Sequence, residues 1–313
     1  MAQLATRRAL STAGSRSRHR REAIVGILWT SPWILGFLIF ALGPVLASLY
    51  LSFNLYSIGG TPTWVGLDNY VKAVSGQDNL FWPSVGRTFE YALIMVPVGI
   101  ACSLLIAIAL NQRLSLTPIL RTAYFLPSLT PIVASALIWA WLFQPEFGAI
   151  NWLLSLIKIR GSLWLADSGT ALSSLMIIGL WGSVGGSTMI IFLAGLQGVP
   201  AELLEAAQID GAGRWTRFRH VTLPMLSPTL LFNLIIGIVA ALQVFTVAIV
   251  ATSGGPNYAT WFFIVHLYQN GFINFDMGYA SALAWIFLVI VLLITLVQVR
   301  LSSRWVYYEG ESR

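Results

Sequence analysis

The chain has 313 residues, of which 57% are hydrophobic, 13% aromatic and only 10% charged. A soluble domain of this length needs far more charge on its surface, so the composition indicates a membrane protein. The formal net charge of +6 does not indicate a nucleic-acid partner, because the basic residues sit in short patches beside apolar runs, as expected for contact with anionic lipid headgroups.

The N-terminal segment is a basic tail. Residues 1–21 contain six arginines and no acidic residue. We interpret residues 1–23 as a cytoplasmic tail that reinforces the orientation of the chain. Its composition also fits a mitochondrial targeting peptide. A cleaved signal is a third interpretation, although the apolar run that follows is much longer than the apolar region of a signal.

Six apolar segments are long enough to cross a bilayer, which requires about 20 mostly apolar residues. They cover approximately residues 24–51, 91–110, 123–143, 170–193, 225–250 and 278–299. The sequence therefore predicts an all-α, polytopic membrane protein. Its six-helix transmembrane domain covers residues 24–299, and a C-terminal tail covers residues 300–313.

Lysine and arginine are distributed unevenly among the segments that connect the spans. The tails and alternate connections contain Arg7, Arg8, Arg16, Arg18, Arg20, Arg21, Arg113, Arg121, Arg214, Arg217, Arg219, Arg300, Arg304 and Arg313. The remaining connections contain only Lys72, Arg87, Lys158 and Arg160. Because basic residues gather on the cytoplasmic side, both termini and residues 205–224 are predicted to be cytoplasmic.

The spans lack the groups that several classes of membrane protein need. No Asp, Glu, Lys or Arg lies in the middle of a span, which favours a neutral, hydrogen-bonding solute over a transported ion. The pattern GxxxxGK[ST] does not occur, so the chain has no phosphate-binding loop and any ATP must be hydrolysed by a separate subunit. The only cysteine, Cys102, lies in an apolar segment and excludes a disulfide framework.

Residues 200–224 form a charge-dense segment between the fourth and fifth spans. Pro200 suits the first position of a helix, and Glu202 and Glu205 favour the positive end of the helix dipole. Gly211 is a natural stop, since glycine adopts the left-handed conformation after a helix. The first half of the segment is therefore predicted to be a short helix that ends in a tight turn.

A second short helix is predicted from Arg214 to about Thr222, with the chain turning into the membrane at Pro224. Trp215, Phe218 and Val221 recur every three residues and form one ridge on it. Two interpretations fit this pattern. The segment lies flat on the membrane with its aromatic residues at the interface, or it docks into a cytoplasmic partner with the aromatic ridge buried.

The spacing of this segment resembles the EAA signature of permease subunits of bacterial ABC importers: Glu-Ala-Ala, three residues, Gly, nine residues, then Ile-x-Leu-Pro. The matching positions are Glu205, Ala206, Ala207, Gly211, Val221, Leu223 and Pro224, with Val in place of Ile. We call residues 200–224 the EAA segment. Three further stretches, WVGLDNY at 64–70, RTAYFLP at 121–127 and GGPNYAT at 254–260, are similar to the carbohydrate-uptake branch, the permeases for maltose and glycerol 3-phosphate. The resemblance covers the chain from about residue 25 onward.

The resemblance implies a type I ABC importer permease fold in which the EAA segment is a cytoplasmic coupling helix, seated in a cleft of the ATPase. The residues implied in ATPase coupling are Glu205, Ala206, Ala207, Asp210, Gly211, Arg214, Trp215, Phe218, Leu223 and Pro224. The implied partners are a second permease subunit, two copies of a cytoplasmic ATPase and an extracytoplasmic solute-binding protein, in the bacterial inner membrane. ATP and Mg would be bound by the ATPase subunits, and no cofactor is expected in this chain.

Polar residues inside spans are costly unless they face a cavity or another helix. The candidates for the solute path are Trp181, Gly185, Ser187 and Thr188 in span four and Asn233, Gly237, Gln243 and Thr246 in span five. Trp181 is suited to stacking on a sugar ring, and the glycines allow close approach. Helix–helix packing is the alternative role for each residue, but similar permeases build their solute site from the spans beside the EAA loop.

The predicted function is that of one membrane subunit of an ABC importer for a neutral carbohydrate, which catalyses nothing itself. Another polar solute such as glycerol 3-phosphate is an alternative. A secondary carrier would need an ion site in the membrane, and none is visible. A membrane-embedded enzyme would need a catalytic cluster, yet His19, His220 and His266 are widely separated.

Overall fold

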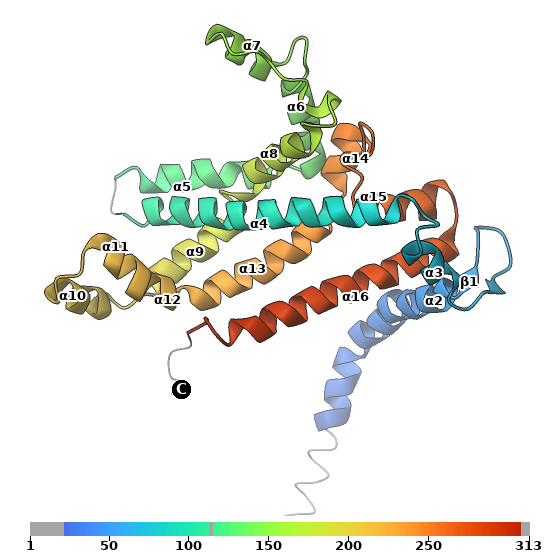
Figure 1. The fold of residues 1–313 in the computed structure, drawn as a ribbon. Helices are drawn as coiled ribbons and strands as arrows, with labels where there is room; N and C mark the ends of the chain where they lie inside the picture. The colour runs from blue at the N-terminus through green and yellow to red at the C-terminus, as the bar shows by residue number, and fades with distance from the viewer. Residues whose placement is uncertain (1–21, 113–114, 308–313) are drawn as a thin grey trace, which may run out of the picture.

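The computed structural model of the protein describes residues 22–112 and 115–307 (Figure 1). Within these ranges the regular structure is helical, apart from a two-stranded antiparallel ribbon, β1 (Asn54–Leu55) and β2 (Thr63–Trp64), and one isolated bridge between Ser57 and Asp276. Residues 1–21 of the predicted N-terminal tail, residues 308–313 of the predicted C-terminal tail, and Arg113 lie outside the described residues.

Three helices are long and apolar enough to cross a membrane without a break: Glu22–Ser52, which ends in α2 (Gly43–Ser52), α4 (Phe81–Leu110) and α16 (Met277–Ser302). They correspond to the first, second and sixth predicted spans. Helix α4 begins ten residues before the predicted boundary at 91. Its additional turns contain the charged residues Arg87 and Glu90, which form an ion pair at 2.7 Å on the helix surface, but also Phe81, which is buried in the core. Hydropathy therefore placed the boundary at the first charged residue, whereas the helix continues past it.

The other three predicted spans are bent pairs of helices. The angles are 94° between Thr117–Leu129, which contains α5 (Thr117–Phe125), and α6 (Ile132–Leu142), 49° between α8 (Ala171–Ser183) and α9 (Ser187–Gln197), and 65° between Arg214–Met225 and α13 (Ser227–Leu242). If each pair counts as one span, the described residues contain up to six spans by length and composition. Proline and glycine explain two of the breaks, because Pro131 precedes α6 and Gly185 and Gly186 separate α8 from α9.

The predicted boundaries of the fifth span, 225–250, are wrong. The helical element starts inside the EAA segment, and α13 ends at Leu242. Gln243 and Phe245 leave helical geometry, and α14 (Thr246–Thr252) is a separate helix that packs against α6 and α8. Hydropathy could not find this break, because the residues on both sides of it are equally apolar and uncharged.

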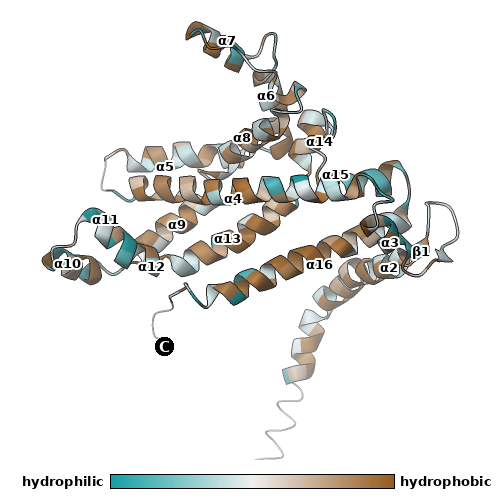
Figure 2. Cartoon of the chain, in the orientation of Figure 1, coloured by the Kyte–Doolittle hydropathy of each residue, from teal (hydrophilic) through white to brown (hydrophobic). Residues whose placement is uncertain are grey.

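The remaining short elements connect these helices. They are α3 (Asp68–Val74), α7 (Ala149–Leu156), a 3-10 turn at Trp164–Ala166, α10 (Ala201–Ile209), α11 (Arg214–Arg217), α12 (Leu223–Met225), α15 (Phe263–Tyr268) and a π-helical turn at Gln269–Ile273. Hydrophilic residues gather at opposite ends of the long helices, around α10–α12 at one end and around α3 and α15 at the other (Figure 2). We call the second of these the far end.

The WVGLDNY motif caps the helix Glu22–Ser52 at the far end. The Nδ2 atom of Asn69 donates hydrogen bonds to the carbonyl oxygens of Ser52 at 2.9 Å and Asn54 at 3.0 Å. The hydroxyl of Tyr70 donates to Ser52 Oγ at 2.7 Å. Because the last carbonyls of a helix have no partner within it, this motif supplies the donors that end the first span.

A buried polar network also joins three segments at the far end. The Oδ2 atom of Asp78 accepts a hydrogen bond from the Tyr279 hydroxyl at 2.5 Å and lies 2.7 Å from His266 Nε2. Trp261 Nε1 donates to His266 Nδ1 at 3.2 Å. Since Nδ1 accepts, the proton of a neutral His266 is on Nε2 and points at the carboxylate. The network therefore holds His266 in its neutral form.

The two titratable groups of the network outside the spans both have shifted pKa values. Burial raises the pKa of Asp78, but hydrogen bonds from Tyr279 and Leu80 and the nearby His266 outweigh it, so the net pKa lies below the usual value. Burial lowers the pKa of His266, and the Asp78 carboxylate opposes only part of this effect. Lys72, which forms an ion pair with Asp276 at 3.4 Å, contributes a smaller lowering.

Acidification is therefore expected to destabilise the far end. A group whose pKa is lowered by folding contributes stability above its unfolded pKa, about 6.5 for histidine, and this contribution declines as the pH falls below that value. We expect the melting temperature of the purified protein, followed by tryptophan fluorescence, to fall between pH 7.5 and 5.5. His266→Gln should flatten this dependence, and His220→Gln, which changes an exposed histidine, should not. An equally steep fall in His266→Gln would contradict this account.

Candidate functional site

The first half of the EAA segment is a helix closed by a complete glycine cap. Pro200 was predicted to be the first residue of this helix. It is instead the residue before α10, with φ −57° and ψ 130°. Gly211 has φ +81°. Its N–H donates to the carbonyl of Gln208 at 3.1 Å, and Ala212 N–H donates to the carbonyl of Ala207 at 2.9 Å. These two bonds form a Schellman motif, which requires a left-handed residue at Gly211.

The second half of the segment is one continuous helical element. Helix α11 passes into a π-helical turn at Phe218–Thr222 and then into α12. The prediction that the chain turns at Pro224 is wrong by two residues, because Pro224 lies in the first turn of α12 and the 65° bend follows Met225.

A hydrogen bond joins the two halves, from Arg217 to Gln208 Oε1 at 2.8 Å. The segment also exposes large apolar side chains: Trp215 is 70% exposed and Ile209 86%. The ring of Trp215 lies over Phe218, with centroids 5.6 Å apart, and Phe218 is half-buried. Two members of the predicted ridge, Trp215 and Phe218, are thus in contact, and Trp215 is left uncovered by the part of the chain that the structure describes.

All ten residues predicted for ATPase coupling lie on this helix–turn–helix. Six are exposed, namely Glu205, Ala206, Asp210, Gly211, Arg214 and Trp215, and four are half-buried, namely Ala207, Phe218, Leu223 and Pro224.

A hollow of about 410 Å³ lies between α4, α8, α9, α13 and α14. It brings together five of the eight residues predicted for the solute path, which are Thr188, Asn233, Gly237, Gln243 and Thr246. No Asp, Glu, Lys, Arg or His lines it. We call it the central pocket.

Two polar groups of the central pocket are buried. Asn233 is 5% exposed, and its Nδ2 donates to the carbonyl of Thr229 at 2.8 Å. The described residues supply no partner for its Oδ1. Tyr91 is also 5% exposed, and its hydroxyl has no hydrogen-bond partner among them. Tyr91 was missed by sequence reasoning, because a tyrosine at the edge of a predicted span is typical of a residue at the membrane interface.

The central pocket depends on a glycine of α8 at its edge. A Cβ at Gly179 would lie 2.6 Å from the Tyr91 hydroxyl and 2.7 Å from Met95 Cε. No real Cβ makes such contacts, so only glycine lets α8 approach α4 here without displacing Tyr91.

The other three predicted path residues do not line this pocket. Trp181 follows Gly179 by two residues and therefore lies about 200° around α8 from it. It lines a separate apolar hollow of about 530 Å³, with its ring 6.0 Å from that of Trp139. At Gly185 a Cβ would collide with the carbonyl oxygen of Tyr124, so the close approach there is by another helix. Ser187 is exposed at the start of α9.

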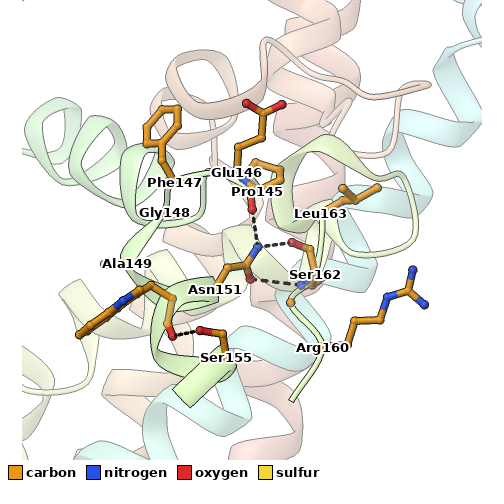
Figure 3. Close-up of a pocket in the computed structure, with 12 residues that line it drawn as sticks. Pro145, Glu146, Phe147, Gly148, Ala149, Asn151, Ser155, Arg160, Ser162 and Leu163 are labelled. Atoms are coloured by element: carbon orange, nitrogen blue, oxygen red, sulfur yellow. Dashed lines mark hydrogen bonds between the residues drawn. The ribbon is translucent and has the colours of Figure 1, made fainter. Parts of the chain in front are cut away.

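A hollow of about 830 Å³ lies in the segment that projects beyond α6 (Figure 3). Asn151 organises it: Nδ2 donates to the carbonyls of Pro145 at 3.0 Å and Ser162 at 2.9 Å. Its Oδ1 accepts from Ser162 N at 3.1 Å and from Trp164 Nε1 at 2.7 Å. The amide is therefore fully used by the protein, and this hollow, unlike the central pocket, is lined by the charged residues Glu146 and Arg160.

Comparison with known proteins identifies what the chain is similar to. Residues 95–307 match the family described as binding-protein-dependent transport system inner membrane component. The chain is 42% identical over 296 residues to the probable ABC transporter permease protein YesP of Bacillus subtilis, covering 93% of this chain and 94% of that protein. It is 33% identical over 285 residues to the trehalose/maltose transport system permease protein MalF of Thermococcus litoralis, covering 90% and 95%.

The fold is also similar to a solved structure. A bacterial ABC transporter involved in the import of the acidic polysaccharide alginate superposes with a TM-score of 0.80 at 24% identity, covering 91% of this chain and 96% of that chain. At this identity the likeness shows the fold alone. It confirms the predicted all-α importer permease fold.

Proposed function

The chain belongs to the family of binding-protein-dependent transport system inner membrane components, and on this premise we propose that it is the permease subunit that carries a neutral carbohydrate through an ATP-driven importer. The observation that carries the choice of solute is the central pocket, which has neutral hydrogen-bonding groups, Tyr91 and Asn233, and no charged lining residue. Curated relatives named for trehalose/maltose and for arabinooligosaccharides, at 33% and 31% identity, support the same class.

The lining of the central pocket favours a neutral sugar over glycerol 3-phosphate. A phosphate or carboxylate group transferred from water into a membrane domain needs a compensating cation or a cluster of donors. None of the arginines or lysines of the described residues lines this pocket. Hydroxyl groups, by contrast, are matched by the free acceptor of Asn233 and the hydroxyl of Tyr91.

The exposed surface of the EAA segment supports the proposed ATPase partner. Trp215 and Ile209 are large, apolar and solvent-exposed on a rigid helix–turn–helix. Side chains of this kind are typically those that become buried when a complex forms. Two ATPase copies with ATP and Mg, a second permease subunit and an extracytoplasmic solute-binding protein complete the proposed assembly. It resides in the bacterial inner membrane.

A single bent element connects the EAA segment to the central pocket. Helices α11 and α12 run into α13, and Asn233 lies six residues, or about 9 Å, beyond the bend. ATP-driven closure of the ATPase subunits would move α11 and α12. Because α13 belongs to the same element, Asn233 and Gly237 would move with it. The central pocket would then open to the opposite side of the membrane.

The direct test of this function is reconstitution in lipid vesicles. The complex with its ATPase and binding protein should take up one or more members of a panel of neutral saccharides in an ATP-dependent way. This chain alone should hydrolyse no ATP above background. Uptake by the lone chain that is driven by a proton or sodium gradient, without ATP, would instead establish a secondary carrier.

We also propose that both termini and residues 200–223 are cytoplasmic, while residues 54–88 and 145–168 are external. The distribution of lysine and arginine supports this orientation. Cysteines introduced at the exposed residues Ser57, Ile159 and Gly213, after Cys102→Ser, test it with an impermeant thiol reagent on whole cells. We expect labelling at the first two positions and protection at Gly213. The reverse pattern would invert the topology.

A further inference from the structure

The bend between α12 and α13 is fully buried. Leu226 is 0% exposed and Ser227 5%. On one side it is enclosed by α9, because a Cβ at Gly195 would lie 2.9 Å from Leu226 Cδ2 and 3.0 Å from Thr229 Oγ1. This packing is tight enough that α9 restricts how the bend can move.

The described segment that follows α16 contacts the same bend. After α16 ends at Ser302, the chain turns, with Val306 N–H donating to the carbonyl of Ser302 at 2.9 Å, and Val306 becomes 4% exposed. The next residue, Tyr307, donates its backbone N–H to Ser227 Oγ at 2.8 Å. Figure 1 shows this end of α16 beside α12. We call residues 303–307 the C-terminal strap.

The hydroxyl of Ser227 forms hydrogen bonds with both Pro224 and Tyr307. Pro228 lacks an N–H, and so it cannot supply a backbone donor at the bend. Ser227 Oγ donates its proton to the carbonyl of Pro224 at 2.6 Å. With that single proton engaged, Ser227 Oγ can only accept from a further group, and the strap provides the donor. One side chain thus connects α12, α13 and the end of α16.

We propose that the C-terminal strap is a positioning element for coupling: it ties the bend of the EAA segment to the last span, so that movement of α11 and α12 displaces α13 and α16 together. This rests on the proposed function of the EAA segment. Without the strap, the ATPase would still dock and hydrolyse ATP, but the bend would absorb part of the movement and uptake per ATP would fall.

Substitution of Tyr307 tests the strap directly. Tyr307→Pro removes the donated N–H, whereas the matched control Tyr307→Ala keeps it and loses only the exposed ring. Ser227→Ala removes the acceptor, and Ser227→Thr restores a hydroxyl. In the reconstituted complex, we expect Tyr307→Pro and Ser227→Ala to lower solute taken up per ATP hydrolysed by about two- to tenfold, the range of one hydrogen bond. ATPase stoichiometry should be unchanged, and Tyr307→Ala and Ser227→Thr should remain close to wild type.

The double variant Ser227→Ala/Tyr307→Pro should be no worse than Ser227→Ala alone, because both changes delete the same bond. The proposed role of the strap would be wrong if Tyr307→Pro and Ser227→Ala both took up as much solute per ATP as the wild type. Additive losses in the double variant would also contradict it. If Tyr307→Pro does not assemble, a chain that ends at Val306 decides the question, because it lacks the Tyr307 N–H donor but keeps the bond from Ser227 Oγ to the carbonyl of Pro224. Absence of ATP-dependent uptake in the wild-type complex would count against the proposed function instead.

Discussion

Gly211→Val is expected to separate ATP hydrolysis from uptake, or to release the ATPase, while the membrane domain still folds. Gly211 has φ +81° and completes both bonds of the Schellman motif that ends α10. A side chain with a Cβ costs about 1–2 kcal/mol in this conformation, and a β-branched one is disfavoured further. Because an added Cβ would meet no atom within 4 Å, the strain is confined to the turn that fixes α10 relative to α11.

The measurement is co-purification of the ATPase with the variant, followed by uptake and solute-stimulated hydrolysis. Gly211→Ser and Gly213→Ser form a matched pair two residues apart. Gly213 also has open space around it, but its φ of −65° and ψ of 169° suit any residue, and serine is favoured before a helix. Only Gly211→Ser should therefore be impaired. If Gly211→Val retains stoichiometric ATPase and normal uptake, the assignment of the EAA segment as a coupling helix is wrong.

Truncation of the aromatic side chain of Trp215, as in Trp215→Ala, distinguishes docking of the EAA segment into a protein from binding to the membrane. Trp215 is 70% exposed and lies over Phe218. A segment that lies flat on the membrane predicts only graded effects that follow the hydrophobicity of the substituted side chain. A segment seated in a protein cleft predicts a large loss of ATPase when the ridge is truncated, since one aromatic residue at the centre of an interface commonly accounts for at least about 2 kcal/mol.

The sequence predicted the turn at Gly211 correctly because its signals are local. A glycine after an apolar helical stretch requires no knowledge of the rest of the chain. The unbroken spans were predicted for a similar reason, since length and hydropathy suffice. The break after Leu242 was not predicted, because Gln243 and Phe245 interrupt an apolar run without any charge, proline or glycine. After the break, α14 packs on α6 and α8, and these contacts between distant segments leave no local sequence signal.

The candidate pocket was predicted only in part because hydropathy does not identify the neighbours of a helix face. Trp181 and Gly179 are two residues apart, yet they face opposite sides of α8. Gly185 does allow the close approach expected of it, but the approaching group is the backbone of Tyr124. Tyr91 was missed although its hydroxyl and the Asn233 amide line the same hollow, because the two residues are 142 positions apart in the sequence.

Removal of the two buried polar groups of the central pocket is expected to reduce transport strongly. Asn233→Leu removes the free Oδ1 at similar volume, and Tyr91→Phe removes only a hydroxyl. Each hydrogen bond to the solute contributes about 0.5–1.5 kcal/mol, so each variant should lose about two- to tenfold in kcat/KM for uptake. The double variant should lose up to about a hundredfold if the two contacts are independent. Phe232→Leu is the matched control, since Phe232 adjoins Asn233 on α13 but is 50% exposed and outside the pocket.

Deoxy analogues of the transported sugar separate solute binding from packing. Asn233→Leu also breaks the bond from Nδ2 to the carbonyl of Thr229, so a purely structural role predicts a lower melting temperature and an equal loss for every solute. A residue that bonds one hydroxyl predicts something different. The wild-type complex should discriminate against the analogue that lacks this hydroxyl, because the partner group in the pocket is left unpaired. The Asn233→Leu complex should transport the parent sugar and that analogue equally well. If discrimination between the two sugars persists in both Asn233→Leu and Tyr91→Phe, these side chains only pack the helices and the solute binds elsewhere.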